Sequence, residues 1–111
     1  MVGLVPTIHA FTTFVMQRGG FLYIVTNRPH GTLYLGVTAD LPRRIFEHRE
    51  GIYPGFTKQY GLNRLVWHEH FEDIRDAIQR ETTMKHWVRA WKIRTIEMMN
   101  PEWNDLYETL A

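Results

Sequence analysis

Three short hydrophobic runs along the chain have the length and composition of β-strands. Each run is rich in β-branched and aromatic residues, and turn-forming residues stand at its ends. The connection between the first two runs contains Pro29 and Gly31, which predicts a turn and an antiparallel hairpin. Because these two runs are apolar at successive positions, we expect both faces of the sheet to be covered. The predicted strands are residues 20–27, 32–38 and 64–71.

The more polar segments carry helix signals. Asp40 is a suitable N-cap, Pro42 falls in the first turn, and Gly51 is typical of the position just after a helix end. A second, longer helix is predicted from Asp73 to about Trp91, with an apolar stripe along one face. The other expected elements are a loop or broken short helix over 50–63, a helix over 93–99, and a closing turn or short helix over 105–110.

Length and composition indicate one ordinary globular domain. The chain has 111 residues, of which 44% are hydrophobic and 23% are charged. It contains no cysteine, which excludes disulfides and thiolate metal sites and fits the cytoplasm, where we expect the protein. The formal net charge of +1 is far from the strongly basic balance of many nucleic-acid-binding proteins. Any contact with nucleic acid must therefore come from local clusters of basic residues.

The N-terminal residues 1–19 differ from the rest of the chain. They are fairly apolar, but polar residues and a proline interrupt them, and no basic residues precede them as in a secretory signal. The segment is too short and too polar to span a membrane, and we expect no membrane association. It is interpreted as a leader that is disordered, packed against the domain, or upstream of a true start at Met16. The domain itself is expected over 20–108, with 109–111 as a tail.

Candidate chemistry gathers on the predicted hairpin and the helix that follows it. Each strand carries one tyrosine, Tyr23 and Tyr34, while Arg44 and His48 lie on one face of the helix. A guanidinium can hold a phosphate bidentately, and a phenol with a pKa of about 10 can act as a base if a cation or a metal-bound water assists it. The structural alternative is a pair of core tyrosines beside a solvated arginine. Gly36 inside a strand indicates a bulge or the close approach of another group.

A glutamate falls within the apolar stripe of the predicted long helix. With Ile74 at 0° and about 100° per residue, Ile78 lies at about +40°, Val88 at about −40° and Glu81 at about −20°. A buried glutamate needs a partner or a metal. One interpretation is an ion pair with Lys85 at i, i+4, worth a few tenths of a kcal/mol (roughly 0.2–0.5). The other is a ligand for Mg²⁺, which takes one or two carboxylates together with water and phosphate oxygens.

Two further groups of residues have spacings typical of binding sites. His68 and His70 alternate to one face of the third strand, a pattern found in zinc sites, but no other ligand stands at a matching spacing. Lys85, Arg89 and Lys92 recur along one flank of the long helix, which favours either a track for a phosphate backbone or a solvated charged face. The track would also include Arg43, Arg44, Arg49 and Lys58.

Taken in order, these motifs resemble the GIY-YIG nuclease superfamily over about residues 20–108. The first half-motif appears as Phe21-Leu22-Tyr23, which keeps only the tyrosine, and the second as Tyr34-Leu35-Gly36. The sequence is similar to the small stand-alone bacterial branch of the family, and to the nuclease domain that acts in bacterial excision repair. The later matching positions are Arg44, His48, Phe56 to Tyr60, Leu65 to Trp67, Glu81, Lys85, Arg89 and Asn100 to Leu106.

The resemblance implies an α/β fold with a small three-stranded antiparallel sheet flanked by helices, in the order β-β-α-β-α-α. It also implies metal-dependent hydrolysis of DNA, duplex or branched, in repair or recombination. Under this hypothesis Glu81 holds a single Mg²⁺ or Mn²⁺ ion, Arg44 neutralises the scissile phosphate, and His48 assists in positioning. A tyrosine takes the proton of the attacking water, with Tyr23 preferred over Tyr34.

The resemblance further implies a set of substrate-binding residues. They are Gly36, Lys58, Lys85, Arg89 and Asn100. The alternative from another functional class is a non-catalytic module that keeps the fold and binds nucleic acid or a protein partner. The weak net charge argues against tight independent DNA binding and favours a protein partner that supplies specificity, whereas the retained tyrosines, Arg44, His48 and Glu81 favour the enzyme.

Overall fold

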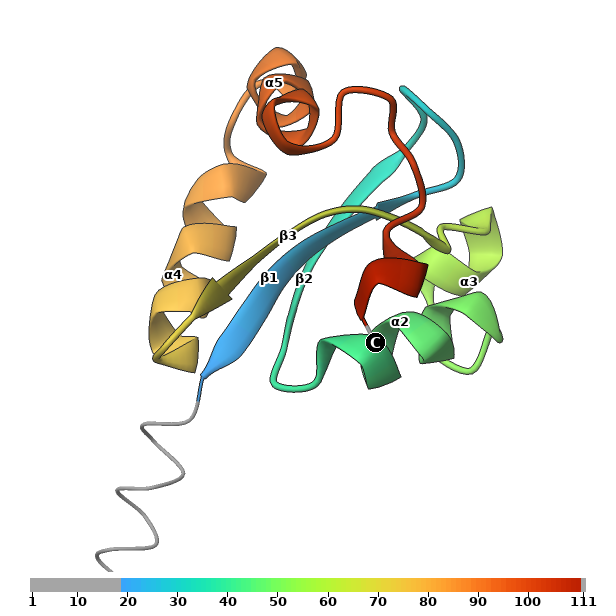
Figure 1. The fold of residues 1–111 in the computed structure, drawn as a ribbon, viewed down its shortest axis with the longest axis horizontal. Helices are drawn as coiled ribbons and strands as arrows, with labels where there is room; N and C mark the ends of the chain where they lie inside the picture. The colour runs from blue at the N-terminus through green and yellow to red at the C-terminus, as the bar shows by residue number, and fades with distance from the viewer. Residues whose placement is uncertain (1–18, 111) are drawn as a thin grey trace, which may run out of the picture.

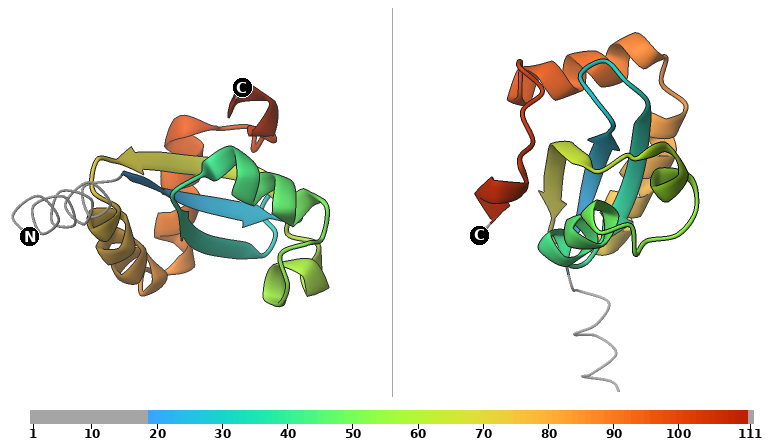
Figure 2. Two further views of the ribbon diagram at one scale, coloured as in Figure 1. Left: turned by 90° about the horizontal axis from the view of Figure 1, so that it is seen from below. Right: turned by 90° about the vertical axis from the view of Figure 1, so that its right-hand side faces the viewer.

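The computed structural model describes residues 19–110, and its centre is one antiparallel sheet. The strands are β1 (Gly20–Thr26), β2 (Leu33–Thr38) and β3 (Arg64–Phe71). Their order is β2-β1-β3, so that β1 pairs with both neighbours, as the right-hand view of Figure 2 shows. The predicted hairpin and third strand are confirmed, with strand ends that differ from the prediction by at most one residue.

Helices surround this sheet in the described part of the chain. The first of them begins where predicted, because the Asp40 carboxylate accepts a hydrogen bond from the backbone N–H of Arg43 at 3.2 Å. After its last residue, Gly51 adopts a φ of +69°, which glycine accommodates without strain. The elements are α2 (Leu41–Arg49), α3 (Phe56–Tyr60), α4 (Ile74–Lys85), α5 (Arg89–Met99) and the short 3₁₀ helix η1 (Tyr107–Leu110).

The sheet is covered on both faces, as its apolar strands predict. Alternation along β1 sends Leu22 and Ile24 to one face and Tyr23 and Val25 to the other, and all four side chains are fully buried. Figure 1 shows α4 and α5 on one side of the sheet and α2 on the other. The first face packs with side chains of α4 and α5, and the second with those of α2 and η1. Two small cores therefore share one central strand.

The predicted single helix from Asp73 to about Trp91 is wrong, because the chain breaks between α4 and α5. α4 ends at Lys85, and Val88 is extended before α5 begins, with φ −64° and ψ 153°. No glycine or proline marks the break. It coincides with Trp87, whose partly buried side chain packs against the core on the α4 side of the sheet. Burial of this large side chain accompanies the turn, and such a tertiary contact leaves no periodic signal.

The buried face of α4 also differs from the predicted stripe. Ile78 and Val88, assigned to it by periodicity, are 48% and 57% exposed. The buried positions of α4 are Ala77 and Met84. Glu81 stands four residues after the first and three before the second, so it still lies beside the buried face of the helix.

The predicted leader and tail fall mostly beyond the described part of the chain. Apart from Gly19, the leader over residues 1–19 lies outside the described residues, as does Ala111 of the tail. None of the described helices is long and apolar enough to span a membrane.

Candidate active site

Tyr23 lies at the centre of the α2 face of the sheet, with its ring against Gly36. The two residues are directly opposite each other in the β1–β2 pairing. A Cβ atom at position 36 would lie 2.5 Å from Tyr23 Cζ and 2.9 Å from Cε1, so only glycine leaves room for the ring. The prediction of a close approach at Gly36 is thereby confirmed. In the structure Gly36 accommodates the Tyr23 ring.

A chain of buried hydrogen bonds leads from Tyr23 into the α2–α3 region. The Tyr23 hydroxyl lies 2.9 Å from Nε2 of His48, and the other ring nitrogen, Nδ1, lies 3.1 Å from the Thr57 hydroxyl. Tyr23, His48 and Thr57 are at most 5% exposed. Thus β1, α2 and α3 each contribute one member, and each polar atom has a partner in an environment where an unpaired one would be costly.

This environment keeps the His48 imidazole neutral. Burial lowers the pKa of His48 to about 4, and the positive charge of Arg44 acts in the same direction, while Glu47 opposes it. At neutral pH one ring nitrogen therefore carries a proton and the other accepts a hydrogen bond. Burial also raises the pKa of Tyr23 well above its ordinary value, although the nearby Arg44 opposes this effect. Tyr23 is thus a neutral phenol in the described protein.

Arg44 reaches the same area from one turn earlier on α2. Its guanidinium lies 4.6 Å from the centre of the Tyr53 ring, and its Nε donates to Glu47 at 3.3 Å. Glu47 also contacts Arg43 at 3.5 Å. The Arg44 side chain is 26% exposed against 76% for Arg43, so the first is held in place at the site while the second extends into solvent.

Tyr34, like Tyr53 and unlike the buried Tyr23, is partly accessible to solvent. It lies on the same face of the sheet as Tyr23, with its ring centre 6.0 Å from that of His48. Its side chain is only partly buried. Burial, followed by the neighbouring Tyr53 and then the Glu81 carboxylate, raises the pKa of Tyr34 to about 12, against the opposing effect of Arg44.

Glu81 approaches the cluster from α4. Its carboxylate contributes to the raised pKa of Tyr34, and α4 lies against β1 and β2 on the face opposite α2. The Glu81 side chain is 19% exposed, and its Oε2 lies 3.4 Å from Lys85 Nζ. The predicted ion pair with Lys85 is therefore present. Because Lys85 is 55% exposed, however, the ion pair contributes only a few tenths of a kcal/mol (roughly 0.3–0.5), too little to prevent Glu81 from binding a cation.

The donor set at Glu81 fits a hard divalent ion that takes most of its ligands from elsewhere. In residues 19–110 there is no cluster of three or more histidine, cysteine, aspartate or glutamate side chains. A single carboxylate is compatible with Mg²⁺ or Mn²⁺, since water and phosphate oxygens can complete the shell. Zinc requires three or four protein ligands, and His70 instead packs edge-on against Phe21 with ring centres 4.8 Å apart. The structure therefore gives no support to a zinc site formed by the histidines of β3.

Two residues predicted to bind substrate make internal contacts away from this cluster. The Arg89 guanidinium donates to the carbonyl oxygens of His30 and Gly31, and so ties α5 to the turn between β1 and β2. Asn100 is 4% exposed, and its amide donates to the carbonyl oxygens of Val66 and Asn104 at 3.1 and 2.8 Å. The structure gives both residues architectural roles.

The predicted phosphate track is shorter in the structure. Lys58 is exposed on α3, next to Thr57, and the end of its side chain passes 3.9 Å from a Cβ position at Gly51. Arg49 does not extend toward the cluster, since it pairs with Asp105 at 2.7 Å. Lys85 and Lys92 lie near each other, with Lys92 Nζ 3.4 Å from the Lys85 carbonyl oxygen.

Three contributors to the cluster were not identified as site residues from the sequence. Glu47 lies four residues after Arg43 and three after Arg44, and this spacing by itself indicates ion pairs on a helix. Tyr53 and Thr57 come from the irregular segment after α2. They have no periodicity that would place them, and only the path of that segment brings them against Arg44 and His48.

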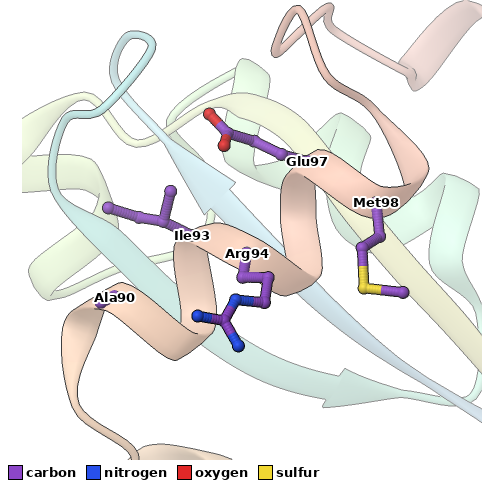
Figure 3. A pocket seen from close by; sticks show the side chains of 5 residues that line it. All are labelled: Ala90, Ile93, Arg94, Glu97 and Met98. Carbon is purple, nitrogen blue, oxygen red and sulfur yellow. The ribbon is translucent and has the colours of Figure 1, made fainter.

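Two surface hollows provide room for ligands. One of about 350 Å³ borders the cluster, with Arg43, Arg44 and Glu47 in its wall beside the start of α2. The other, of about 400 Å³, lies along α5 and shares no residue with the cluster (Figure 3). The first combines two guanidinium groups with two carboxylates, Asp40 and Glu47, whereas the second has one arginine and one glutamate among less polar side chains.

Comparisons with known proteins agree with this description. Residues 19–94 match the GIY-YIG catalytic domain family. A UPF0213 protein of Bacillus pumilus is 33% identical over 87 residues, which are 78% of this chain and 89% of the relative. A UPF0213 protein of Staphylococcus aureus is 34% identical over 77 residues, 69% of this chain and 93% of the relative.

A solved structure provides the same assignment. The solution NMR structure of a UPF0213 protein from Bacillus halodurans matches with a TM-score of 0.50 and 26% identity. The match covers 84% of this chain and 98% of that one. The relatives are thus matched over most of their length, as expected for small stand-alone members. The family match, the relatives and the three-stranded sheet flanked by helices show that this chain belongs to the GIY-YIG family, a nuclease superfamily.

Proposed function

We propose that the protein is a divalent-metal-dependent endonuclease that hydrolyses phosphodiester bonds in duplex or branched DNA, with a role in repair or recombination. The observation that supports this most strongly is the convergence of Tyr34, Arg44 and the Tyr23–His48 pair at one place, where the Glu81 carboxylate also influences the pKa of Tyr34. These groups come from β1, β2, α2 and α4, and their meeting supplies the charge and proton-transfer groups that phosphodiester hydrolysis requires.

Arg44 is proposed to neutralise the scissile phosphate. Its guanidinium is already held by the Tyr53 ring and Glu47, so little conformational freedom is lost when a phosphate binds. The hollow beside Arg44 provides room for the phosphate and its neighbouring sugar. A planar guanidinium can also follow the charge that develops on the phosphate oxygens in the transition state.

Tyr34 is proposed as the phenol that meets the attacking water. The sequence preference for Tyr23 is disfavoured, because Tyr23 is fully buried and its hydroxyl is engaged with His48. The pKa of Tyr34 of about 12 makes it a weak base in the free protein. A bound cation near Glu81 would lower that pKa. Tyr23 and His48 are proposed to support the site from inside, and Lys58 to contact DNA at its margin.

Glu81 is proposed to hold a single Mg²⁺ or Mn²⁺ ion. When bound, such an ion supplies positive charge to the leaving oxygen. In the free protein Lys85 occupies one oxygen of the carboxylate, and because Lys85 is exposed it can move to a DNA phosphate when the ion binds. The formal net charge of +1 predicts modest DNA affinity, which fits a role for a protein partner in substrate choice.

The test is cleavage of supercoiled plasmid and of a labelled branched DNA in Mg²⁺, in Mn²⁺ and in EDTA. Arg44→Ala and Glu81→Gln are each expected to reduce the rate by about 100-fold or more, as loss of one transition-state contact does. Arg94→Ala and Glu102→Gln are matched controls, since both side chains are exposed and lie outside the cluster. They are expected to cleave at the wild-type rate.

The outcomes separate the enzyme from the alternative. Cleavage that needs metal and is lost only in the two cluster variants supports the nuclease. Cleavage that is equal in all preparations indicates a contaminant and overturns the assignment of roles. If no preparation cleaves but DNA is retained in a salt-sensitive manner, the protein is a binding module that keeps the nuclease fold.

A further inference from the structure

Thr57 is the inner end of the buried hydrogen-bond chain, and no role has yet been assigned to its hydroxyl. It is 3% exposed, in the short helix α3, and its hydroxyl lies 3.1 Å from Nδ1 of His48. An apolar residue of the same size would fill this position without the need to satisfy a buried hydroxyl. The contact with the imidazole is therefore the feature to account for.

The Tyr23 end of this series of hydrogen bonds indicates which groups donate and which accept. The Tyr23 hydroxyl has one proton to donate, and within the described residues its hydrogen-bond partner is His48 Nε2. The cation beside it, Arg44, has only donors and cannot accept that proton. If Tyr23 donates this proton to Nε2, Nε2 is the unprotonated nitrogen. The single proton of the neutral imidazole would then lie on Nδ1 and be donated to the Thr57 hydroxyl.

We propose that Thr57 is a positioning residue, whose hydroxyl accepts a hydrogen bond from His48 Nδ1–H and thereby keeps the Nε2 lone pair directed at the Tyr23 hydroxyl. Without this acceptor, the Nδ1–H would be buried with no partner, and the ring would gain by moving its proton to Nε2. In that tautomer Nε2–H and the Tyr23 hydroxyl would both be donors, and their hydrogen bond would weaken.

For catalysis, this inference rests on the proposed function. A neutral His48 with a free electron pair on Nε2 can accept a hydrogen bond from the Tyr23 hydroxyl and hold it in one orientation, whereas the other tautomer cannot. Tyr23 lies on the same face of the sheet as Tyr34. By orienting His48, and through it the Tyr23 hydroxyl, Thr57 would therefore shape the buried side of the candidate active site. Thr57 is buried at the inner end of the hydrogen-bond chain, so it acts through His48.

The test begins with the free protein and needs no nuclease activity. Two-bond ¹H–¹⁵N correlation spectra of the imidazole groups distinguish protonated from unprotonated ring nitrogens, and a His48→Gln variant assigns the signals of His48. Wild type and Thr57→Ser are expected to carry the proton on Nδ1. Thr57→Val keeps the shape but removes the acceptor, so its His48 is expected to shift largely to the Nε2–H form.

A matched control is available in the hairpin. Thr26 is fully buried, and its hydroxyl donates to the Arg28 carbonyl oxygen at 2.9 Å. Thr26→Val therefore removes a buried hydroxyl at a comparable cost in stability, but should leave the His48 signals unchanged. The inference is overturned if wild type carries the proton on Nε2, or if Thr57→Val has the same His48 tautomer as wild type.

Cleavage assays on the same variants then test the catalytic consequence. Thr57→Val is expected to lower kcat about tenfold or more with little change in KM, the order found when the partner that orients a functional histidine is lost. Thr57→Ser should restore it. Unchanged cleavage by a variant whose tautomer has shifted would overturn the catalytic consequence. If wild type does not cleave, the proposed function fails, while the spectra still decide the role of Thr57.

Discussion

Gly36→Ala tests the packing on which the candidate site is built. The new methyl carbon would lie 2.5 Å from Tyr23 Cζ and 2.9 Å from Cε1, closer than non-bonded carbon atoms approach. The ring cannot withdraw easily, since Tyr23 is fully buried and its hydroxyl is bonded to His48. Overpacking of this kind costs about 1–3 kcal/mol. In a strand without the clash, the same change would instead gain about 0.5–1 kcal/mol.

The change in the free energy of unfolding therefore has opposite signs with and without the clash, so a measurement of stability distinguishes the two cases. Urea and thermal unfolding of wild type and Gly36→Ala should show a loss of about 1–3 kcal/mol. For a domain of this size this corresponds to a fall in melting temperature of about 4–8 °C per kcal/mol. Because displacement of the Tyr23 ring also moves its hydroxyl, the imidazole NMR signals of His48 should change as well. A variant as stable as wild type, or more stable, would refute the packing argument.

A double-mutant cycle locates the clash. Tyr23→Leu removes the ring, so Gly36→Ala should cost little in that background, with a coupling free energy of about 1 kcal/mol or more. Tyr23→Phe removes the hydroxyl oxygen, which is the atom nearest to the new methyl, but keeps Cζ at 2.5 Å, so part of the cost should remain. If the cost of Gly36→Ala is the same in the Leu and wild-type backgrounds, the overlap is not with Tyr23.

Three other predictions concern residues of the site and its surroundings. Because the pKa of His48 is about 4 when folded and 6.5 ordinarily, the unfolded chain binds an extra proton between these values, so stability should fall by up to about 3 kcal/mol as pH drops from about 6.5 to 4. Urea unfolding at several pH values should show this loss reduced in His48→Gln; an identical pH dependence would contradict it. Asn100→Ala should cost about 1–3 kcal/mol in the same assay, since it leaves the buried carbonyl oxygen of Val66 without its donor, and a cost under about 0.5 kcal/mol would contradict the architectural role. Arg89→Ala should cost about 1 kcal/mol and speed amide exchange in the β1–β2 turn without weakening DNA binding; a loss of DNA affinity would instead restore Arg89 as a phosphate contact.

Features that depend on neighbours in the chain were predictable from the sequence. The hairpin follows from two β-branched runs around a turn with Pro29 and Gly31, and the start of α2 from the Asp40 cap. The close approach at Gly36 follows from a glycine inside a strand. Each of these is set by local conformational preference, so the residues involved carry the signal themselves.

The position of Glu81 was predicted for a reason that the structure corrects. The apolar stripe was drawn through Ile78 and Val88, which are exposed, whereas α4 buries Ala77 and Met84. Glu81 lies beside both the assumed face and the actual one. The helical periodicity placed a carboxylate near a buried surface, but it gave no sign that the helix breaks after Lys85.

The sequence by itself determined the strands, the first helix and the set of polar residues that the hairpin and α2 bring together, because strand alternation and helix periodicity place side chains over short spans. Only the tertiary structure decided how those residues are used. It buried Tyr23 and left Tyr34 partly exposed, and it brought Thr57 to His48 through an irregular segment. It also turned Arg89 and Asn100 to internal carbonyl oxygens. These contacts join residues far apart in the chain, and packing and the need to satisfy buried polar groups select them only once the elements have assembled.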